Sequence, residues 1–100
     1  MLTKFQKKVY NIVSQIPRGR VASYQDVAKR LGDKNLARAV GKALKHNPFA
    51  PKIPCHRIIS KNGRLGGYKF GLKNKRKILI AEGIKFDEQN LIARRYFFKL

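Results

Sequence analysis

The most chemically distinctive segment of the chain is Pro54-Cys55-His56-Arg57, which holds the only cysteine. A thiol attacks as its thiolate, and nearby cationic groups and an adjacent base favour that form. His56 and Arg57 place a base and a cation directly beside Cys55. The segment therefore predicts a reactive cysteine. The alternative is an inert thiol, because a lone cysteine is most often a small buried hydrophobe.

A carboxylate that fixes the tautomer of His56 would complete an arrangement of nucleophile, base and orienting acid. The chain has only five acidic residues, which are Asp26, Asp33, Glu82, Asp87 and Glu88. The first two fit capping or turn roles, and the last two lie in a polar stretch of the tail. Glu82 is the best candidate. A carboxylate at the C-terminal end of a helix is unfavourable to the helix dipole, so its placement there needs another reason, which a cationic His56 would supply. A solvated acid at that helix end is the alternative.

Three amphipathic helices are expected in the first half of the chain. Residues 3–16 place apolar side chains on one helical face, with Thr3 able to cap the start. Ser23 followed by Asp26 resembles a capping box, and Gly32 ends the helix that this box opens. A third helix carries a regular apolar stripe, which consists of Leu36, Ala39, Val40, Ala43 and Leu44.

The second and third of these helices, over about residues 24–45, match the helix-turn-helix pattern. The outer face of the third helix is basic and carries Arg38, Lys42 and Lys45. The whole chain has 24 Lys and Arg against 5 Asp and Glu, a net charge of +19 that favours a polyanion, above all nucleic acid. Two ordinary helices whose basic face is merely solvated are the alternative.

The second half begins with an irregular segment over residues 47–71, which three prolines keep from being helical. The Asn62-Gly63 pair predicts a turn with a short hairpin. Helical periodicity returns from about residue 73 to 82, with Ile78, Leu79 and Ala81 facing inward. A tail over residues 84–100 follows, so the chain is expected to form one mostly α domain over residues 1–100.

Composition excludes several classes of protein. At 43% hydrophobic residues the chain is too apolar for a disordered basic tail. One cysteine excludes an internal disulfide, and one cysteine with two histidines is too few for a structural zinc site. Neither a membrane span nor a signal peptide is recognisable, so we expect a cytoplasmic protein, associated with the nucleoid or, in a eukaryote, nuclear.

Taken together, the motifs resemble the C-terminal domain of the O6-alkylguanine-DNA alkyltransferases. The resemblance covers roughly residues 5–83 and rests on five motifs in this order and spacing: Arg38-Ala39-Val40-Gly41, Asn47-Pro48, Ile53-Pro54-Cys55-His56-Arg57-Ile58-Ile59, Gly67-Tyr68 and Glu82-Gly83. It implies a small, winged-helix-like helix-turn-helix domain that enters the minor groove, with the reactive cysteine in a pocket behind it. The damaged guanine would be flipped into that pocket, because a protein thiol cannot reach it inside the stacked duplex.

The resemblance also implies a role for each residue of the chemistry. Cys55 matches the acceptor of the alkyl group, His56 the base that acts through a water, and Glu82 its orienting acid. Asn47 matches a residue that braces the hydrogen bonds of the site. Tyr68 matches the tyrosine that assists the leaving guanine.

On the DNA side, Arg38 matches the arginine that fills the vacated place in the stack, and Tyr24 the tyrosine that helps to rotate the nucleotide outward. Without the resemblance, we would interpret Arg38 as a phosphate contact and Tyr24 as an ordinary amphipathic residue near a helix start. The remaining residues expected to bind DNA are Ala37, Gly41, Lys42 and Lys45.

The implied activity is the suicidal repair of double-stranded DNA containing O6-alkylguanine. The product would be a thioether on Cys55, so that each monomer acts once, without metal or cofactor. Many family members have an N-terminal domain, which is expected to be absent here, and Lys69 and Phe70 stand where several members have smaller residues. Relatives called alkyltransferase-like proteins lack the cysteine and only bind the lesion. Lesion sensing and general basic DNA binding are therefore the alternative functions.

Overall fold

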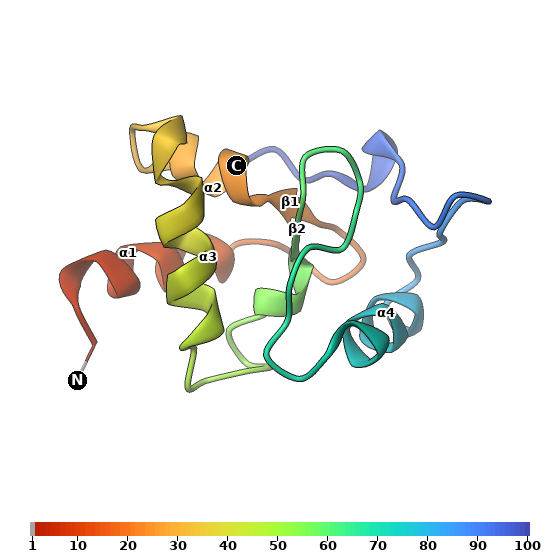
Figure 1. Ribbon diagram of the computed structural model, residues 1–100, viewed down its shortest axis with the longest axis horizontal. Helices are drawn as coiled ribbons and strands as arrows, with labels where there is room; N and C mark the ends of the chain where they lie inside the picture. The colour runs from red at the N-terminus through yellow and green to blue at the C-terminus, as the bar shows by residue number, and fades with distance from the viewer. Residues whose placement is uncertain (1) are drawn as a thin grey trace.

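The computed structural model describes residues 2–100 (Figure 1). Its helices are α1 (Lys4–Val13), α2 (Tyr24–Arg30), α3 (Ala37–Lys45) and α4 (Leu72–Ala81), and its strands are β1 (Ala22–Ser23) and β2 (Ile58–Ile59). Three short 3-10 helices cover Lys34–Leu36, Cys55–Arg57 and Arg94–Tyr96. The mostly helical class predicted from the sequence is confirmed. No described helix is long and apolar enough to cross a membrane.

Local signals set the starts of α1 and α2. The Thr3 side chain accepts a hydrogen bond from the backbone N–H of Gln6, and the Gln6 side chain accepts one from the backbone N–H of Thr3. Ser23 and Asp26 form a second capping box of the same kind. α1, α2 and α3 contact one another pairwise, and α3 crosses α1 in Figure 1. Their fully buried valines are Val9, Val13, Val27 and Val40.

The apolar stripe of α3 is narrower than its sequence suggests. Val40, Ala43 and Leu44 are buried and Leu36 is partly buried, whereas Ala39 is exposed. The prediction for Ala39 is wrong because the buried face is centred between Val40 and Leu44, which leaves Ala39 at its edge. Leu36 itself belongs to the preceding 3-10 turn, so α3 begins one residue later than the stripe.

The two strands form a parallel pair, in which Ala22 lies opposite Ile58 and Ser23 opposite Ile59. The expected short hairpin is therefore wrong for these strands. Residues 60–64 do form a tight turn, closed by a 2.8 Å bond from the Ser60 N–H to the Arg64 carbonyl. No strand returns along β2, because the residues that follow the turn are bound by the side chain of α4 residue Lys75.

The inward face of α4 is set by Lys75 and Leu79, which are both fully buried. Ala81 is exposed, contrary to the sequence prediction, because it lies two residues beyond Leu79 and therefore on the opposite side of the helix.

The tail runs back across the molecule, and its end lies beside α2 (Figure 1). Phe97 pairs in parallel with Val21, next to β1. The Val21 N–H donates to the Tyr96 carbonyl at 2.9 Å, and the Phe98 N–H donates to the Val21 carbonyl at 2.7 Å. Ile84 and Ile92 are buried with Val21, Ile59 and Leu79 in a second apolar cluster, separate from the core of α1, α2 and α3. The tail is thus an integral part of the domain.

Truncating a buried tail side chain should therefore destabilise the whole domain. We expect Ile92→Ala, at a position 3% exposed, to lower the free energy of unfolding by about 2–4 kcal/mol in urea titrations. Ile80→Ala is the matched control, because Ile80 is 48% exposed and its truncation should cost under about 1 kcal/mol. Equal losses in the two variants would contradict the buried position of the tail.

Candidate active site

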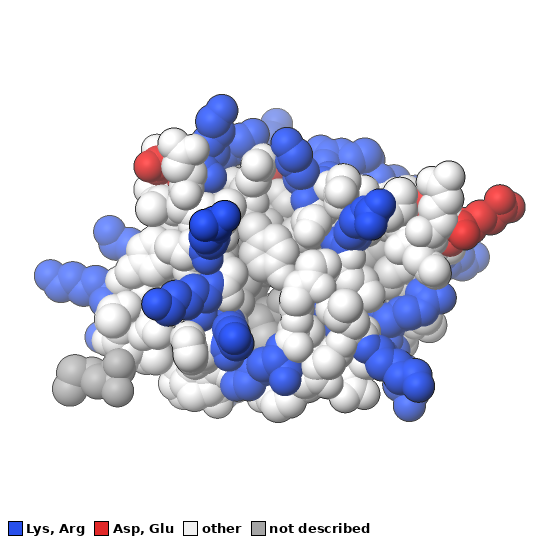
Figure 2. Space-filling model, in the orientation of Figure 1, with Lys and Arg blue, Asp and Glu red and all other residues white. Residues whose placement is uncertain are grey.

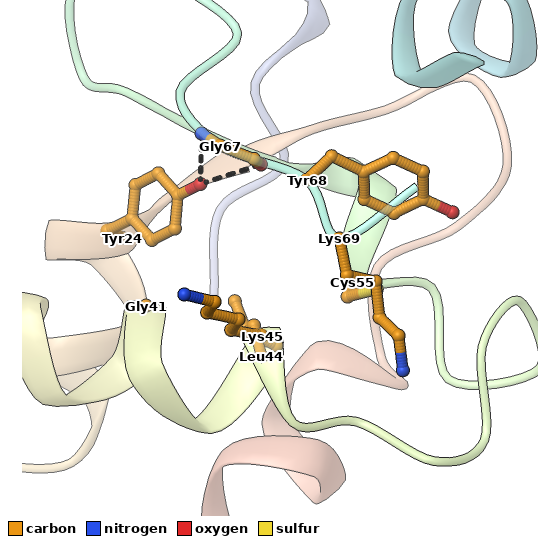
Figure 3. A pocket seen from close by; sticks show the side chains of 8 residues that line it. All are labelled: Tyr24, Gly41, Leu44, Lys45, Cys55, Gly67, Tyr68 and Lys69. Carbon is orange, nitrogen blue, oxygen red and sulfur yellow. Dashed lines mark hydrogen bonds between the residues drawn. The ribbon is translucent and has the colours of Figure 1, made fainter. Parts of the chain in front are cut away.

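Cys55 lies in the wall of a pocket of about 340 Å³ between α2, α3 and the segment before α4 (Figure 3). The thiol residue is 5% exposed and forms no disulfide. Most of the wall is apolar or aromatic, and no acidic residue lines it. The lining residues are Tyr24, Gly41, Leu44, Lys45, Cys55, Gly67, Tyr68 and Lys69.

His56 points away from solvent and meets Glu82, as the search among the acidic residues suggested. Its Nε2 lies 2.9 Å from Glu82 Oε2, and the two side chains are 2% and 7% exposed. Arg57 donates to both oxygens of the same carboxylate, from Nε at 3.0 Å and from Nη2 at 2.8 Å. Its Nη1 also donates to the carbonyl of Ile16, at 2.8 Å. Glu82 is thus held between the two residues that follow Cys55.

Burial decides the charge of His56. Desolvation lowers the pKa of His56 below its ordinary value, in spite of the hydrogen bond with Glu82, which raises it. Burial by itself would raise the pKa of Glu82, but the hydrogen bonds with Arg57 and His56 outweigh it and lower that pKa. The pair therefore consists of a neutral imidazole and a carboxylate at neutral pH.

The carboxylate also assigns the tautomer of His56. Because Glu82 accepts a hydrogen bond at Nε2, the ring proton belongs on Nε2 and leaves Nδ1 with a free lone pair. Nδ1 is buried and has no hydrogen-bond partner among the described residues. A buried, unpaired acceptor next in sequence to a thiol is suited to accept a proton, directly or through one water.

Asn47 anchors the loop that leads into Cys55. The side chain is fully buried; its Nδ2 donates to the Ile53 carbonyl at 3.0 Å and its Oδ1 accepts from the Phe49 N–H at 2.9 Å. These two bonds fix the irregular turn just before Pro54. The structure thus places Asn47 behind the cysteine loop, as a brace of its backbone.

Tyr24 and Gly67 form one side of the pocket. The Tyr24 hydroxyl lies 3.3 Å from both the N–H and the carbonyl of Gly67 (Figure 3). Gly66 has a φ of +71°, and a Cβ at this position would lie 2.8 Å from the Tyr24 ring. The approach of the loop to Tyr24 therefore requires a glycine at residue 66.

Tyr68 lies farther along the same loop, and its hydroxyl points away from Tyr24 (Figure 3). Its ring contacts Phe70 edge-on, with ring centroids 5.4 Å apart. Burial raises the pKa of Tyr68, so its hydroxyl keeps its proton at neutral pH and can donate it. The structure brings Tyr68 into the wall that also holds Cys55.

The residues expected to bind DNA are concentrated on α3. Arg38, Lys42 and Lys45 are exposed, Ala37 and Gly41 are half-buried, and both Gly41 and Lys45 also line the pocket. Figure 2 shows Lys and Arg side chains gathered around a hollow on the face that carries α3. The basic helix and the cysteine pocket therefore share one wall.

Lys75, a fully buried lysine of α4, is not among the site residues predicted from the sequence. Its Nζ donates to the carbonyls of Ile58 at 2.6 Å and Gly67 at 2.9 Å, and also to that of Leu65. It lies 5.9 Å from the centroid of the Tyr24 ring. The only signal in the sequence was the placement of Lys75 four residues before Leu79, on the same helical face.

A helix-turn-helix with a thiol pocket behind it defines a class of small helical domains in which a buried thiol lies beside a basic, exposed helix. The chain matches the family described as "6-O-methylguanine DNA methyltransferase, DNA binding domain" over residues 4–84, and it belongs to this family. The resemblance inferred from the sequence motifs is thus confirmed.

Relatives with similar sequences carry the name methylated-DNA–protein-cysteine methyltransferase. The protein of Methanosarcina acetivorans is 46% identical over 81 residues, which are 81% of this chain and 52% of that protein. The protein of Methanothermobacter thermautotrophicus is 42% identical over 87 residues, 87% of this chain and 48% of that protein. The chain therefore spans about half the length of the curated relatives it matches.

Two solved structures show the same fold. Mycobacterium tuberculosis OGT in complex with DNA aligns with a TM-score of 0.80 and 42% identity, over 83% of this chain and 51% of that chain. S. pombe Atl1 in complex with damaged DNA containing O6-carboxymethylguanine aligns with a TM-score of 0.83 and 29% identity, over 100% of both chains. The second alignment includes the tail, which lies beyond the family match.

The buried position of Lys75 predicts a pH-dependent stability. Burial lowers the pKa of Lys75 from 10.5 to about 7. Between these values the unfolded chain binds a proton that the folded chain lacks, so stability rises with pH. We expect this group to add about 2–3 kcal/mol to the free energy of unfolding between pH 7 and pH 9.

Urea titrations at the two pH values should show this rise in the unsubstituted chain and its loss in Lys75→Met. Lys77→Met is the control, because Lys77 lies exposed on the same helix and should leave the rise unchanged. If stability still rises with pH in Lys75→Met, the rise comes from other groups, and Lys75 stays protonated among the carbonyls to which it donates.

Proposed function

We propose that this domain repairs DNA by direct reversal, transferring the alkyl group of an O6-alkylguanine to Cys55. The observation that carries the proposal is the buried arrangement of Cys55, a neutral His56 with a free Nδ1, and a Glu82 carboxylate on its Nε2. This arrangement suits the activation of a thiol. Membership of the family and the names of the relatives support the same chemistry.

The proposed reaction is a single displacement at the alkyl carbon. The Cys55 thiol gives its proton to Nδ1 of His56, directly or through a water, and Glu82 stabilises the imidazolium that forms. The sulfur then attacks the alkyl carbon, a sulfur–carbon bond forms, and the bond from that carbon to O6 breaks. The leaving guanine regains a proton, for which the Tyr68 hydroxyl is the proposed donor. No metal or cofactor enters this balance.

The product makes the reaction stoichiometric. A thioether has no ionisable sulfur, so Cys55 cannot act again and each molecule is consumed. The domain would therefore act as a single-turnover methyltransferase, as a monomer on its DNA, in the compartment that holds the genome.

Access to the lesion requires the nucleotide to leave the duplex, because a stacked base cannot present its O6 substituent to a thiol in line. The proposed DNA surface is α3, with Arg38 entering the vacated place in the stack and Tyr24 guiding the nucleotide. The net charge of +19 and the exposed lysines of α3 suit the phosphate backbone. The related OGT and Atl1 structures are complexes with DNA.

A lesion sensor without transfer is the second candidate function. It is favoured by the alignment with S. pombe Atl1, which covers both chains completely. In that case the pocket would hold the modified guanine, and Cys55 would be only a small residue in its wall. A general basic DNA-binding protein is the third candidate, and it would have no preference for alkylated DNA.

Mixing the protein with a short duplex that contains one O6-methylguanine distinguishes the three candidates. We expect the intact protein to gain one methyl group on Cys55, the guanine to be restored, and the reaction to stop at one equivalent. Cys55→Ala should bind the duplex and transfer nothing. An unchanged mass with lesion-selective binding would favour the sensor, and binding without any preference would favour the general DNA-binding protein.

Glu82→Gln tests the proposed role of His56 as the base. The substitution keeps the shape of the side chain and removes the charge that stabilises the imidazolium, so we expect the methyl-transfer rate constant to fall about 100-fold. Binding of the lesion duplex should change less than about threefold. Glu88→Gln, at an exposed acid of the tail, is the control. The proposed proton path is wrong if both variants transfer at the rate of the unsubstituted chain.

A further inference from the structure

The side chain of Lys69 spans one side of the cysteine pocket. Lys69 follows Tyr68 in the loop before α4, and its side chain lines the pocket together with Cys55 (Figure 3). Its Nζ donates a 2.7 Å hydrogen bond to the carbonyl of Asn47, two residues beyond the end of α3. A lysine of the loop before α4 is thus tethered to the backbone of the loop that leads into Cys55.

The far end of this tether is rigid. Asn47 is fully buried, and both ends of its side-chain amide are hydrogen-bonded to the loop that it braces. Its N–H also donates to the Leu44 carbonyl, at 3.1 Å. The carbonyl that receives Lys69 is therefore fixed in place.

The ammonium of Lys69 has a second, aromatic contact. The Lys69 ammonium lies 5.1 Å from the centroid of the Phe70 ring, and Phe70 in turn meets Tyr68 edge-on. The tether therefore joins the loop that carries Tyr68 to the end of α3.

The bond to Asn47 also determines what Lys69 offers to a ligand. The ammonium is engaged by the carbonyl, so the part of the side chain that is left to line the pocket is its methylene stem. The other lysine of the pocket, Lys45, has no hydrogen bond with any described residue. Lys69 is therefore held in the pocket wall, whereas the Lys45 side chain has no such tether among the described residues.

We propose that Lys69 is a specificity-determining residue, whose tethered stem limits the size of the O6 substituent that can reach Cys55. The inference rests on the proposed function, because it assigns a substrate range to the same pocket. Small groups such as methyl would fit beside the stem, and bulky groups such as benzyl would meet it. A single methylene in an apolar pocket can change discrimination by about 10- to 200-fold, so a whole lysine stem is a substantial barrier.

The test compares single-turnover alkyl transfer from duplexes carrying O6-methylguanine and O6-benzylguanine, followed by intact mass. We expect Lys69→Ala to raise the ratio of the benzyl to the methyl rate constant at least tenfold. Lys69→Met keeps an unbranched stem without the tether, and we expect an intermediate ratio. Lys45→Ala is the matched control and should leave the ratio within about twofold of the unsubstituted value. Lys69 is exposed, and melting temperatures check that all variants fold.

The proposal is overturned if Lys69→Ala leaves the ratio unchanged, or if Lys45→Ala raises it equally. A Lys69→Met ratio equal to that of the unsubstituted chain would overturn the role of the tether. The same comparison is made by equilibrium binding of the two duplexes to Cys55→Ala, with and without Lys69→Ala. If neither duplex alkylates Cys55, the proposed transfer fails, and the binding ratio alone then decides whether Lys69 limits the pocket.

Discussion

The Glu82 carboxylate holds together the parts of the molecule on which the proposed chemistry depends. It lies at the C-terminal end of α4 and accepts hydrogen bonds from both His56 and Arg57. Arg57 also binds the carbonyl of Ile16, just beyond α1. One buried carboxylate therefore joins α4, the turn that carries Cys55 and the segment after the first helix. Its loss would leave Arg57 without an anionic partner, and an unpaired charge is costly in a protein interior.

The cysteine pocket and the basic helix are one structural unit, because they share residues. Gly41, Leu44 and Lys45 of α3 form one wall, and Tyr24 at the start of α2 forms another. Any contact that orients α3 on a duplex therefore also orients the opening of the pocket. This shared wall gives a physical reason for coupling nucleotide extrusion to chemistry in the proposed mechanism.

Lys75 and the tail stabilise this unit through contacts with β2, with the loop that contacts Tyr24, and with the residue before β1. The side-chain nitrogen of Lys75 gathers the carbonyls of Ile58, Leu65 and Gly67 around one buried point, which connects β2 with the loop that contacts Tyr24. The tail adds a backbone pairing at Val21, just before β1. A chain with a net charge of +19 repels itself, and these internal contacts oppose that repulsion.

The sequence by itself determined the features that depend on neighbouring residues. The caps at Thr3 and Ser23, the helical class and the position of Cys55 beside a histidine and an arginine follow from side chains a few positions apart. The link between His56 and Glu82 was anticipated from the small number of acids, from the position of Glu82 at a helix end and from the family resemblance.

Tertiary structure alone decided which distant segments meet. The expected hairpin is replaced by a parallel pairing of β2 with β1. Lys75 is buried, whereas Ala39 and Ala81 are exposed. Lys69 is bonded to the backbone of Asn47. The reason is physical: the pattern of polar and apolar residues specifies which face of an element is buried, but not which backbone carbonyls will lie opposite it. The hydrogen-bond partners of a buried lysine nitrogen or of a strand edge come together only after the chain has folded.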